Sequence, residues 1–204
     1  MPGKVTLVGA GPGDPGLLTC KGLEALQKAE VVVYDRLVSP AILAMMPETA
    51  EQINVGKQAA RHPVPQEQIN RILLDKALAG KNVVRLKGGD PFLFGRGGEE
   101  LELLAGHGVA FEEVPGISSS IAAPAYGGIP VTHRDCCSSL HIITGHQRAG
   151  KALDIDFEAL VRTKGTLVFL MGVSALRAIV GGLLGAGMDP ATPAAVVERG
   201  TTPA

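Results

Sequence analysis

The chain contains a short apolar run that ends abruptly in glycine and one carboxylate. Val83, Val84 and Leu86 predict a buried strand. The next residues, GGDP at 88–91, must turn, and their bare backbone can approach another group closely. A second glycine cluster at 95–98 leads into an acidic helix start. Such a strand end predicts a small-molecule site at the edge of an α/β sheet, and a plain glycine-rich connection is the alternative.

Strand-like and helix-like segments alternate along the whole chain. We expect strands at 4–8, 31–34, 83–86, 111–114, 140–144, 166–170 and 194–197, and helices at 19–29, 66–78, 99–105, 157–161 and 173–184. This order predicts an α/β fold with a mostly parallel sheet covered by helices.

The glycine- and serine-rich stretch after the fourth expected strand predicts a division into two α/β lobes with a cleft between them. We expect an N-terminal lobe over 1–115, a linker over 116–130 and a C-terminal lobe over 131–204. The sequence ends in a turn-like segment directly after the last expected strand. We therefore expect the natural protein to continue beyond Ala204, so that the C-terminal lobe is truncated here.

Composition excludes several classes of protein. With 46% hydrophobic and 19% charged residues the chain can form a sizeable core, and its 3% aromatic content and net charge of −1 argue against a nucleic-acid surface. No apolar run approaches the roughly 20 residues that span a bilayer. Cys20, Cys136 and Cys137 form neither a disulfide framework nor a metal-binding spacing. We expect a cytoplasmic protein without a metal, membrane or nucleic-acid partner.

The first glycine loop, GAGPGDPG at 9–16, lies where a dinucleotide-binding loop would lie. Its spacing is wrong, because Asp14 occupies the third glycine position, and Pro12 and Pro15 remove backbone donors. A pocket for a ligand without phosphates is favoured, and a structural tight turn is the alternative. A nicotinamide-dependent oxidoreductase that uses Gly9–Gly13 and Asp35 remains a second hypothesis.

Asp35 and a set of cations could supply the chemistry. Asp35 ends the second strand, where it is either a base facing the site or an ordinary turn residue. Basic side chains near expected loops indicate an anion-binding cleft, with a solvated basic loop as the alternative. These side chains are Lys57, Arg61, His62, Arg85, Lys87, Arg96, His133 and Arg134.

Together these motifs resemble the tetrapyrrole methylase family, whose members use S-adenosylmethionine. The resemblance runs from Val5 to Thr201 through VGAGPGDPGLLT, VVYDRLV, HPVPQEQIN, VVRLKGGDPFLFGRGGEE, VPGISSSIAAPAYGGIPVTHR, TGH, MG and RGT. It implies two successive C-methylations of uroporphyrinogen III to precorrin-2, on the route to sirohaem and cobalamin. By family analogy it also implies a homodimer. A non-catalytic tetrapyrrole-binding module is the third hypothesis.

The resemblance implies roles for individual residues, with S-adenosylmethionine folded in the cleft between the lobes. Asp35 matches the family's proposed proton acceptor and Lys57 its proposed donor. Arg134 matches a basic residue suited to the carboxylates of the substrate, and we assign Arg61, His62 and Arg96 to the same task. The implied cofactor contacts are Pro12, Gly88, Gly89, Asp90, Leu93, Ser118, Ser119, Met171 and Gly200.

Overall fold

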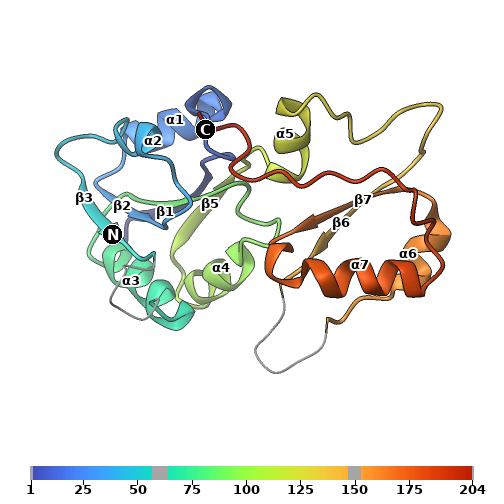
Figure 1. Ribbon diagram of the computed structural model, residues 1–204. Coiled ribbons are helices and arrows are strands. Elements are labelled where there is room, and N and C mark those ends of the chain that lie inside the picture. Colours follow the sequence, from blue (N-terminus) through green and yellow to red (C-terminus); the bar gives the residue numbers. More distant parts are fainter. Residues whose placement is uncertain (1, 57–63, 147–152, 204) are drawn as a thin grey trace. The chain divides into compact units, whose positions relative to one another are not determined.

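The computed structural model describes residues 2–56, 64–146 and 153–203. The chain divides into two compact units (Figure 1). Unit 1 consists of Met1–Ala122 together with Arg199–Ala204, and unit 2 of Ala123–Glu198. The division falls within helix α5 (Ser119–Tyr126), inside the segment predicted as a linker. The last six residues therefore belong with the N-terminal part of the chain.

Unit 1 is an open parallel sheet with helices on both faces. Its strands are β1 (Lys4–Gly9), β2 (Val31–Tyr34), β3 (Glu51–Asn54), β4 (Val83–Lys87) and β5 (Ala110–Val114). Its helices are α1 (Cys20–Gln27), α2 (Pro40–Leu43), α3 (Gln66–Leu78) and α4 (Gly97–Gly106), with a short 3-10 turn η1 (Pro15–Leu17). The α/β class and the parallel sheet predicted from the sequence are confirmed.

Two apolar layers hold the sheet between its helices (Figure 1). Helices α3 and α4 cover one face, where Leu73 and Leu104 pack with the valines of β1, β2 and β4. Helices α1 and α2 cover the other, where Leu26 and Ile42 pack with Val8 and its neighbours. Because strand side chains alternate between faces, the odd-numbered residues of β4 point toward α3 and α4.

The strand order, β3-β2-β4-β1-β5, contains one topological switch point. The connection after β1 runs through α1 toward β2, and the connection after β4 runs through α4 past β1 to β5. The neighbouring strands β1 and β4 therefore send their chains to opposite faces of the sheet. Ligands of open α/β sheets bind at such a point.

Unit 2 pairs two parallel strands, β6 (Leu140–Thr144) and β7 (Thr166–Leu170), with helices α6 (Phe157–Thr163) and α7 (Leu176–Gly185). A 3-10 turn, η2 (Val173–Ala175), precedes α7. The strand predicted at Ala194–Val197 is wrong: these exposed residues have no strand pairing among the described residues. Within the described ranges, no helix has the length and apolar character needed to cross a bilayer.

Candidate functional site

Three strand ends of unit 1 meet backbone to backbone at the switch point. Gly11 and Gly89 form an antiparallel bridge: the Gly11 N–H donates to Gly89 O at 3.1 Å, and the Gly89 N–H donates to Gly11 O at 2.7 Å. A Cβ on Gly9 would lie 2.4 Å from the Gly116 Cα, and one on Gly116 would lie 2.2 Å from Gly89 O. Only glycine fits at these two positions, so the loops after β1, β4 and β5 pack in direct backbone contact and form one surface.

Asp90 ties the loop after β4 to the loop after β5. Its Oδ1 accepts hydrogen bonds from the Phe92 and Leu93 amides at 2.9 and 3.0 Å, and its Oδ2 accepts one from the Gly116 amide at 3.1 Å. The carboxylate predicted to contact the cofactor is thus bound to backbone amides on both oxygens. Leu93, which is also predicted to contact the cofactor, donates its amide to the same carboxylate.

The loop after β2 joins this edge and carries Asp35. A Cβ on Gly88 would lie 2.5 Å from the Leu37 Cβ, so the two loops are in close contact. Asp35 Oδ1 accepts a hydrogen bond from the Leu37 amide at 2.9 Å, and Oδ2 lies 3.5 Å from the Arg85 guanidinium. The Asp35 side chain is 24% exposed. Asp35 is thus a turn residue that is also partly exposed, and its role as a base stays a prediction.

The C-terminal segment of unit 1 lies against the first glycine loop. The Asp14 amide donates to Thr201 Oγ1 at 3.4 Å, and a Cβ on Gly13 would lie 2.5 Å from Thr202 Cγ2. Gly200 therefore lies beside the loop that contains Pro12. This brings together two of the segments predicted to contact the cofactor.

The same loop has the wrong geometry for a dinucleotide. Asp14, at the third glycine position, accepts a hydrogen bond from the Gly16 amide at 2.7 Å and caps η1. Helix α1 begins only at Cys20, and its N-terminal amide at Gly22 is already capped by Thr19 Oγ1 at 3.0 Å. A diphosphate needs free amides at a helix start that follows the strand directly. The loop at 9–16 therefore does not support the hypothesis of a nicotinamide-dependent oxidoreductase.

Two of the cations predicted near loops are buried instead. Arg85 and Lys87 are 3% and 4% exposed, and both bind Glu100, which is fully buried at the start of α4. Arg85 Nε and Lys87 Nζ lie 3.1 and 2.9 Å from Glu100 Oε1. Burial and the charge of Arg85 lower the pKa of Lys87, although Glu100 opposes this. The prediction that these two side chains contribute to an open anion-binding cleft is wrong, because their position in β4 points them into the α3/α4 layer.

The other predicted site residues are placed as follows. Ser119 is the first residue of α5, and the preceding Ser118 accepts a hydrogen bond through its hydroxyl from the Ser120 amide at 3.2 Å. Arg96 has a left-handed backbone and pairs with Glu99 through two hydrogen bonds of 2.8 and 2.6 Å, which raise the pKa of Arg96. Lys57, Arg61 and His62 lie outside the described residues.

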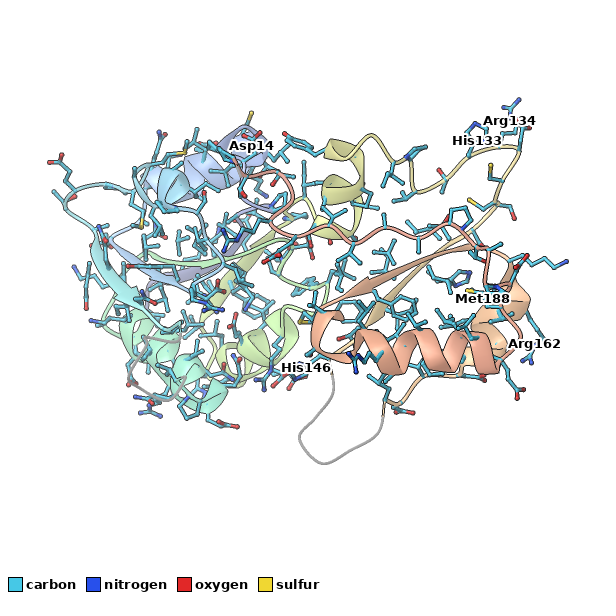
Figure 2. The ribbon with its side chains drawn as sticks, in the orientation of Figure 1. Asp14, His133, Arg134, His146, Arg162 and Met188 are labelled. Carbon is cyan, nitrogen blue, oxygen red and sulfur yellow. The ribbon has the colours of Figure 1, made fainter. Side chains whose placement is uncertain are left out.

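Unit 2 holds the remaining two. Met171 follows β7 with a left-handed backbone and a 53% exposed side chain. Arg134 and its neighbour His133 are exposed on the loop after α5, and both point away from the ribbon (Figure 2). Of the predicted site residues that the structure describes, most lie in the loops that follow the strands of unit 1, and Met171 and Arg134 belong to unit 2.

Sequence reasoning missed two carboxylates near this edge. Glu100 was seen only as part of an acidic helix start, yet it is the anion that holds Arg85 and Lys87. Glu113 on β5 has its pKa raised by burial and by the charge of Asp90. The sequence held one signal for Glu100. Two cations lie in a strand expected to be buried, and the next helix begins with acidic residues, which the helix dipole favours at that end.

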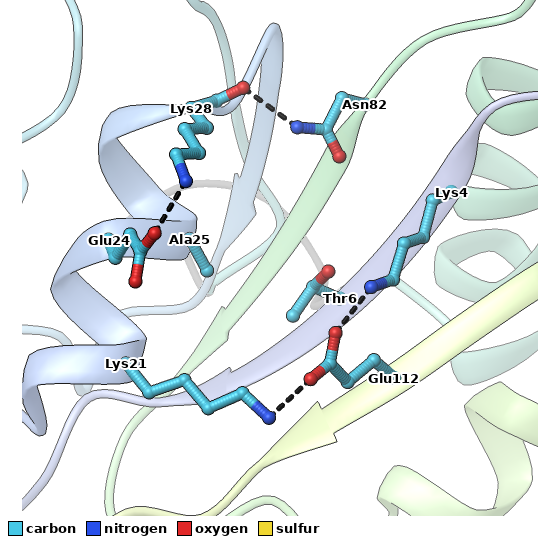
Figure 3. A pocket seen from close by; sticks show the side chains of 8 residues that line it. All are labelled: Lys4, Thr6, Lys21, Glu24, Ala25, Lys28, Asn82 and Glu112. Carbon is cyan, nitrogen blue, oxygen red and sulfur yellow. Dashed lines mark hydrogen bonds and ion pairs between the residues drawn. The ribbon is translucent and has the colours of Figure 1, made fainter.

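A hollow of about 290 Å³ lies at the opposite, amino edge of the sheet (Figure 3). Its cations are paired: Lys4 and Lys21 bind Glu112, and Lys28 binds Glu24. Asn82 donates to the Lys28 carbonyl at 2.7 Å. Because its charges are neutralised and parallel sheets bind ligands at the carboxyl ends of their strands, this hollow is not the candidate site. Among the described residues, no three His, Cys, Asp or Glu side chains are grouped to hold a metal ion.

An open parallel sheet with glycine loops joined at its switch point defines an α/β protein that binds a ligand at the carboxyl ends of its strands. The chain belongs to the tetrapyrrole (corrin/porphyrin) methylases, whose family profile matches residues 4–204.

Curated relatives and solved structures agree with this family. The chain is 62% identical over 201 residues to the porphyrin biosynthesis protein HemD of Ruminiclostridium josui, and 54% identical over 200 residues to the siroheme synthase of Pseudomonas putida. These matches cover 98% of the chain but 40% and 43% of the relatives, so the chain spans about two fifths of their length.

Among solved structures, the uroporphyrin-III C-methyl transferase of Thermus thermophilus complexed with S-adenyl homocysteine superposes with a TM-score of 0.83. It is 45% identical, and the match covers 98% of this chain and 80% of that one. The cobalt precorrin-4 methyltransferase CbiF superposes with a TM-score of 0.78 at 32% identity, over 91% of this chain and 75% of the other.

Proposed function

We propose that this chain transfers methyl groups from S-adenosylmethionine to carbon atoms of uroporphyrinogen III, twice, and so forms precorrin-2. The observation that carries the proposal is the backbone bridge between Gly11 and Gly89 at the switch point, which creates a binding edge without a phosphate cradle. The likeness to the Thermus thermophilus uroporphyrin-III C-methyl transferase supports this substrate and this donor.

The bare edge fits S-adenosylmethionine. Gly89 has a φ of +69°, and no atom lies within 4 Å of the place where its Cβ would be, so the bridge borders open space. A ligand can therefore lie directly on the backbone there. The donor carries a sulfonium and no phosphate, which agrees with a first loop that lacks free helix-start amides. We assign its binding to Pro12, Gly88, Gly89, Asp90, Leu93, Ser118, Ser119, Met171 and Gly200.

The loops at this edge also offer apolar surface. Leu37 after β2, Phe92 and Phe94 after β4, and Ile117 after β5 are all exposed, from 37% to 69%. Exposed apolar side chains on neighbouring loops support a binding surface here, because a contiguous apolar patch marks an interaction or ligand site. They suit the faces of an adenine ring and of a tetrapyrrole macrocycle.

Arginine side chains suit the acidic substituents of that macrocycle. We assign Arg134, Arg61, His62 and Arg96 to the substrate carboxylates. In the free protein Arg96 is paired with Glu99, so binding through Arg96 requires the substrate to share or replace that carboxylate.

Bound S-adenosylmethionine supplies the electrophilic methyl group, and the chain supplies position and proton control. Holding donor and acceptor in line is worth on the order of 7–11 kcal/mol. Methylation makes the attacked ring carbon quaternary and leaves the macrocycle cationic, so one net proton must leave from a pyrrole N–H or a neighbouring meso carbon. Asp35, at the end of β2 and partly exposed, accepts that proton. A proton that Lys57 donates elsewhere on the macrocycle is matched by a second proton lost there, so each methylation releases one proton. General base catalysis of this kind contributes roughly 10²- to 10⁴-fold.

Incubation of the chain with uroporphyrinogen III and methyl-labelled S-adenosylmethionine, without oxygen, tests the proposal. We expect a product that carries two labelled methyl groups. Calorimetric titration with S-adenosylhomocysteine and, separately, with NADH is the accompanying binding measurement. Binding of the macrocycle without any transfer of labelled methyl groups would identify a non-catalytic tetrapyrrole-binding module. Binding of NADH alone would overturn the methylase assignment.

We also propose that the protein works as a homodimer in the cytoplasm. The exposed apolar residues of α7 in unit 2, Leu176, Val180 and Leu184, support an association surface. Sedimentation of the chain over a range of concentrations tests the assembly, and a monomer at all concentrations would contradict it.

A further inference from the structure

We propose that Arg85 is a positioning residue that holds the Asp35 carboxylate in place at the end of β2, and that the buried Glu100 holds Arg85. The proposal deepens the function given above and rests on it for the role of Asp35. The observation behind it is a continuous line of charged groups, Glu100, Arg85 and Asp35, that runs from the α3/α4 layer to the carboxyl edge of the sheet.

The guanidinium of Arg85 is fixed from several sides. Its Nε donates to Glu100 Oε1 at 3.1 Å, and one terminal nitrogen donates to the carbonyls of Leu86 and Val33 at 3.0 and 3.4 Å. The other terminal nitrogen faces Asp35 Oδ2 at 3.5 Å. A planar guanidinium that is held by three hydrogen bonds through two of its nitrogens presents its third nitrogen in one direction only. That nitrogen faces the carboxylate proposed as the base.

Asp35 is thereby restrained on both oxygens. Oδ1 is bound to the Leu37 amide and Oδ2 faces Arg85. Among the described residues, the charged groups that act on Asp35 from the neighbouring strand are Arg85 and Lys87, and Lys87 touches Glu100 rather than Asp35. In the part of the chain that the structure describes, Arg85 is the cation paired with Asp35, so it restrains the position of Asp35 Oδ2.

Stability alone does not account for an arginine at this position. Residues 83, 85 and 87 share one face of β4, and the first of them is a core valine. Replacing a buried ion pair by apolar residues of similar size is often neutral or stabilising, because two charges no longer have to leave water. Glu100 even retains one buried oxygen, Oε2, with no partner among the described residues. We therefore explain the buried charges by the contact that the terminal nitrogen of Arg85 makes with Asp35.

A double-mutant cycle between Arg85 and Asp35 tests the proposal. We expect Arg85→Met to lower kcat roughly ten- to a hundredfold, as expected for a displaced catalytic group, with the affinity for S-adenosylhomocysteine unchanged within about threefold. In an Asp35→Asn background the same substitution should lower kcat no further, because the group that it positions is gone. Lys87→Met, which removes another cation bound to Glu100 without touching Asp35, is the matched control and should retain most of kcat.

Additive losses in the cycle, or equal losses in Arg85→Met and Lys87→Met, would overturn the proposal, since either result indicates a general effect on the fold. If Arg85→Met does not fold, the triple variant Arg85→Met/Lys87→Met/Glu100→Met replaces it, because that variant removes the buried cations and their shared carboxylate together and leaves none of them unpaired. It should show the same non-additivity with Asp35→Asn.

A crystallographic readout separates this inference from the proposed function. In the folded Arg85 variant we expect the Asp35 side chain to leave its wild-type rotamer or to occupy several. An Asp35 carboxylate that stays in place would overturn the positioning role even if methyl transfer occurs. A wild-type protein that transfers no methyl group would overturn the proposed function, and the Asp35 rotamer would still decide the role of Arg85.

Discussion

The Asp90 carboxylate accepts a hydrogen bond from the Gly116 amide at 3.1 Å, which fastens the loop after β4 to the loop after β5. The other oxygen of Asp90 binds the amides of Phe92 and Leu93 within its own loop. Asp90 therefore shapes the edge on which the ligand is proposed to lie, and we expect its carboxylate to affect ligand binding through the backbone that it holds.

Asp90→Ala should weaken binding of S-adenosylhomocysteine at least tenfold and lower the free energy of unfolding by roughly 2–3 kcal/mol. The reason is that three backbone amides lose a charged acceptor at once. Isothermal calorimetry and urea unfolding are the two measurements. Asp90→Asn is the matched control, because it retains one acceptor oxygen and turns an amide N–H toward Gly116. Wild-type affinity in the alanine variant would contradict the placement of the ligand at this edge.

Gly116→Ala should destabilise unit 1 by about 1–3 kcal/mol and weaken the same binding. The added Cβ would lie 2.2 Å from Gly89 O and 2.6 Å from the Gly9 Cα, and both are backbone atoms that cannot swing away. Gly98→Ala in α4 is the control, since no atom lies within 4 Å of the new Cβ and helix propensity favours alanine. Thermal unfolding of the two variants gives the comparison, and equal melting temperatures would refute the tight junction.

The central strands were predictable because their side chains are buried on both faces. The apolar runs at 4–8, 31–34 and 83–86 can bury the side chains of both their faces only inside a covered sheet. The structure places β1, β2 and β4 there. β3 escaped prediction because it is an edge strand of EQIN, exposed at three of four positions. The strand predicted at Ala194–Val197 is absent, because apolar and β-branched residues form a strand only where a neighbouring strand is available for pairing.

The site residues whose placement depends on the local sequence could be predicted. Those whose burial depends on residues from another element could not. The glycine loops and Asp90 could be recognised because a turn at a strand end constrains its own residues. That Arg85 and Lys87 are buried could not be read locally, since it depends on Glu100 returning from the next helix to pair with both. A cation is expected on the surface until its partner is known.

Asp35→Asn should leave S-adenosylhomocysteine binding unchanged and lower kcat by roughly 10²- to 10⁴-fold, as for loss of a general base. The fold should survive, because an asparagine oxygen can still accept from the Leu37 amide that Asp35 Oδ1 now binds at 2.9 Å. Steady-state methyl transfer and calorimetry are the measurements. Asp75→Asn, which removes an exposed carboxylate of α3 paired with Arg71, is the matched control and should behave as wild type. Normal turnover in Asp35→Asn would remove Asp35 from the mechanism.

The ion pairs of Glu112 at the amino edge of the sheet should affect acid stability and not ligand binding. Hydrogen bonds from Lys21 and then from Lys4 lower the pKa of Glu112 to about 2. Since the folded-state pKa of Glu112 lies below the unfolded value, its contribution to stability is complete above about pH 4.5 and is lost as the pH falls toward 2.

Glu112→Gln should therefore cost under about 1 kcal/mol at pH 7, as usual for partly exposed pairs, and the difference from wild type should shrink toward zero near pH 2. Urea unfolding at both pH values measures this, with Glu102→Gln on α4 as the control; a difference that persists at low pH would show that Glu112 stabilises the fold by something other than its charge.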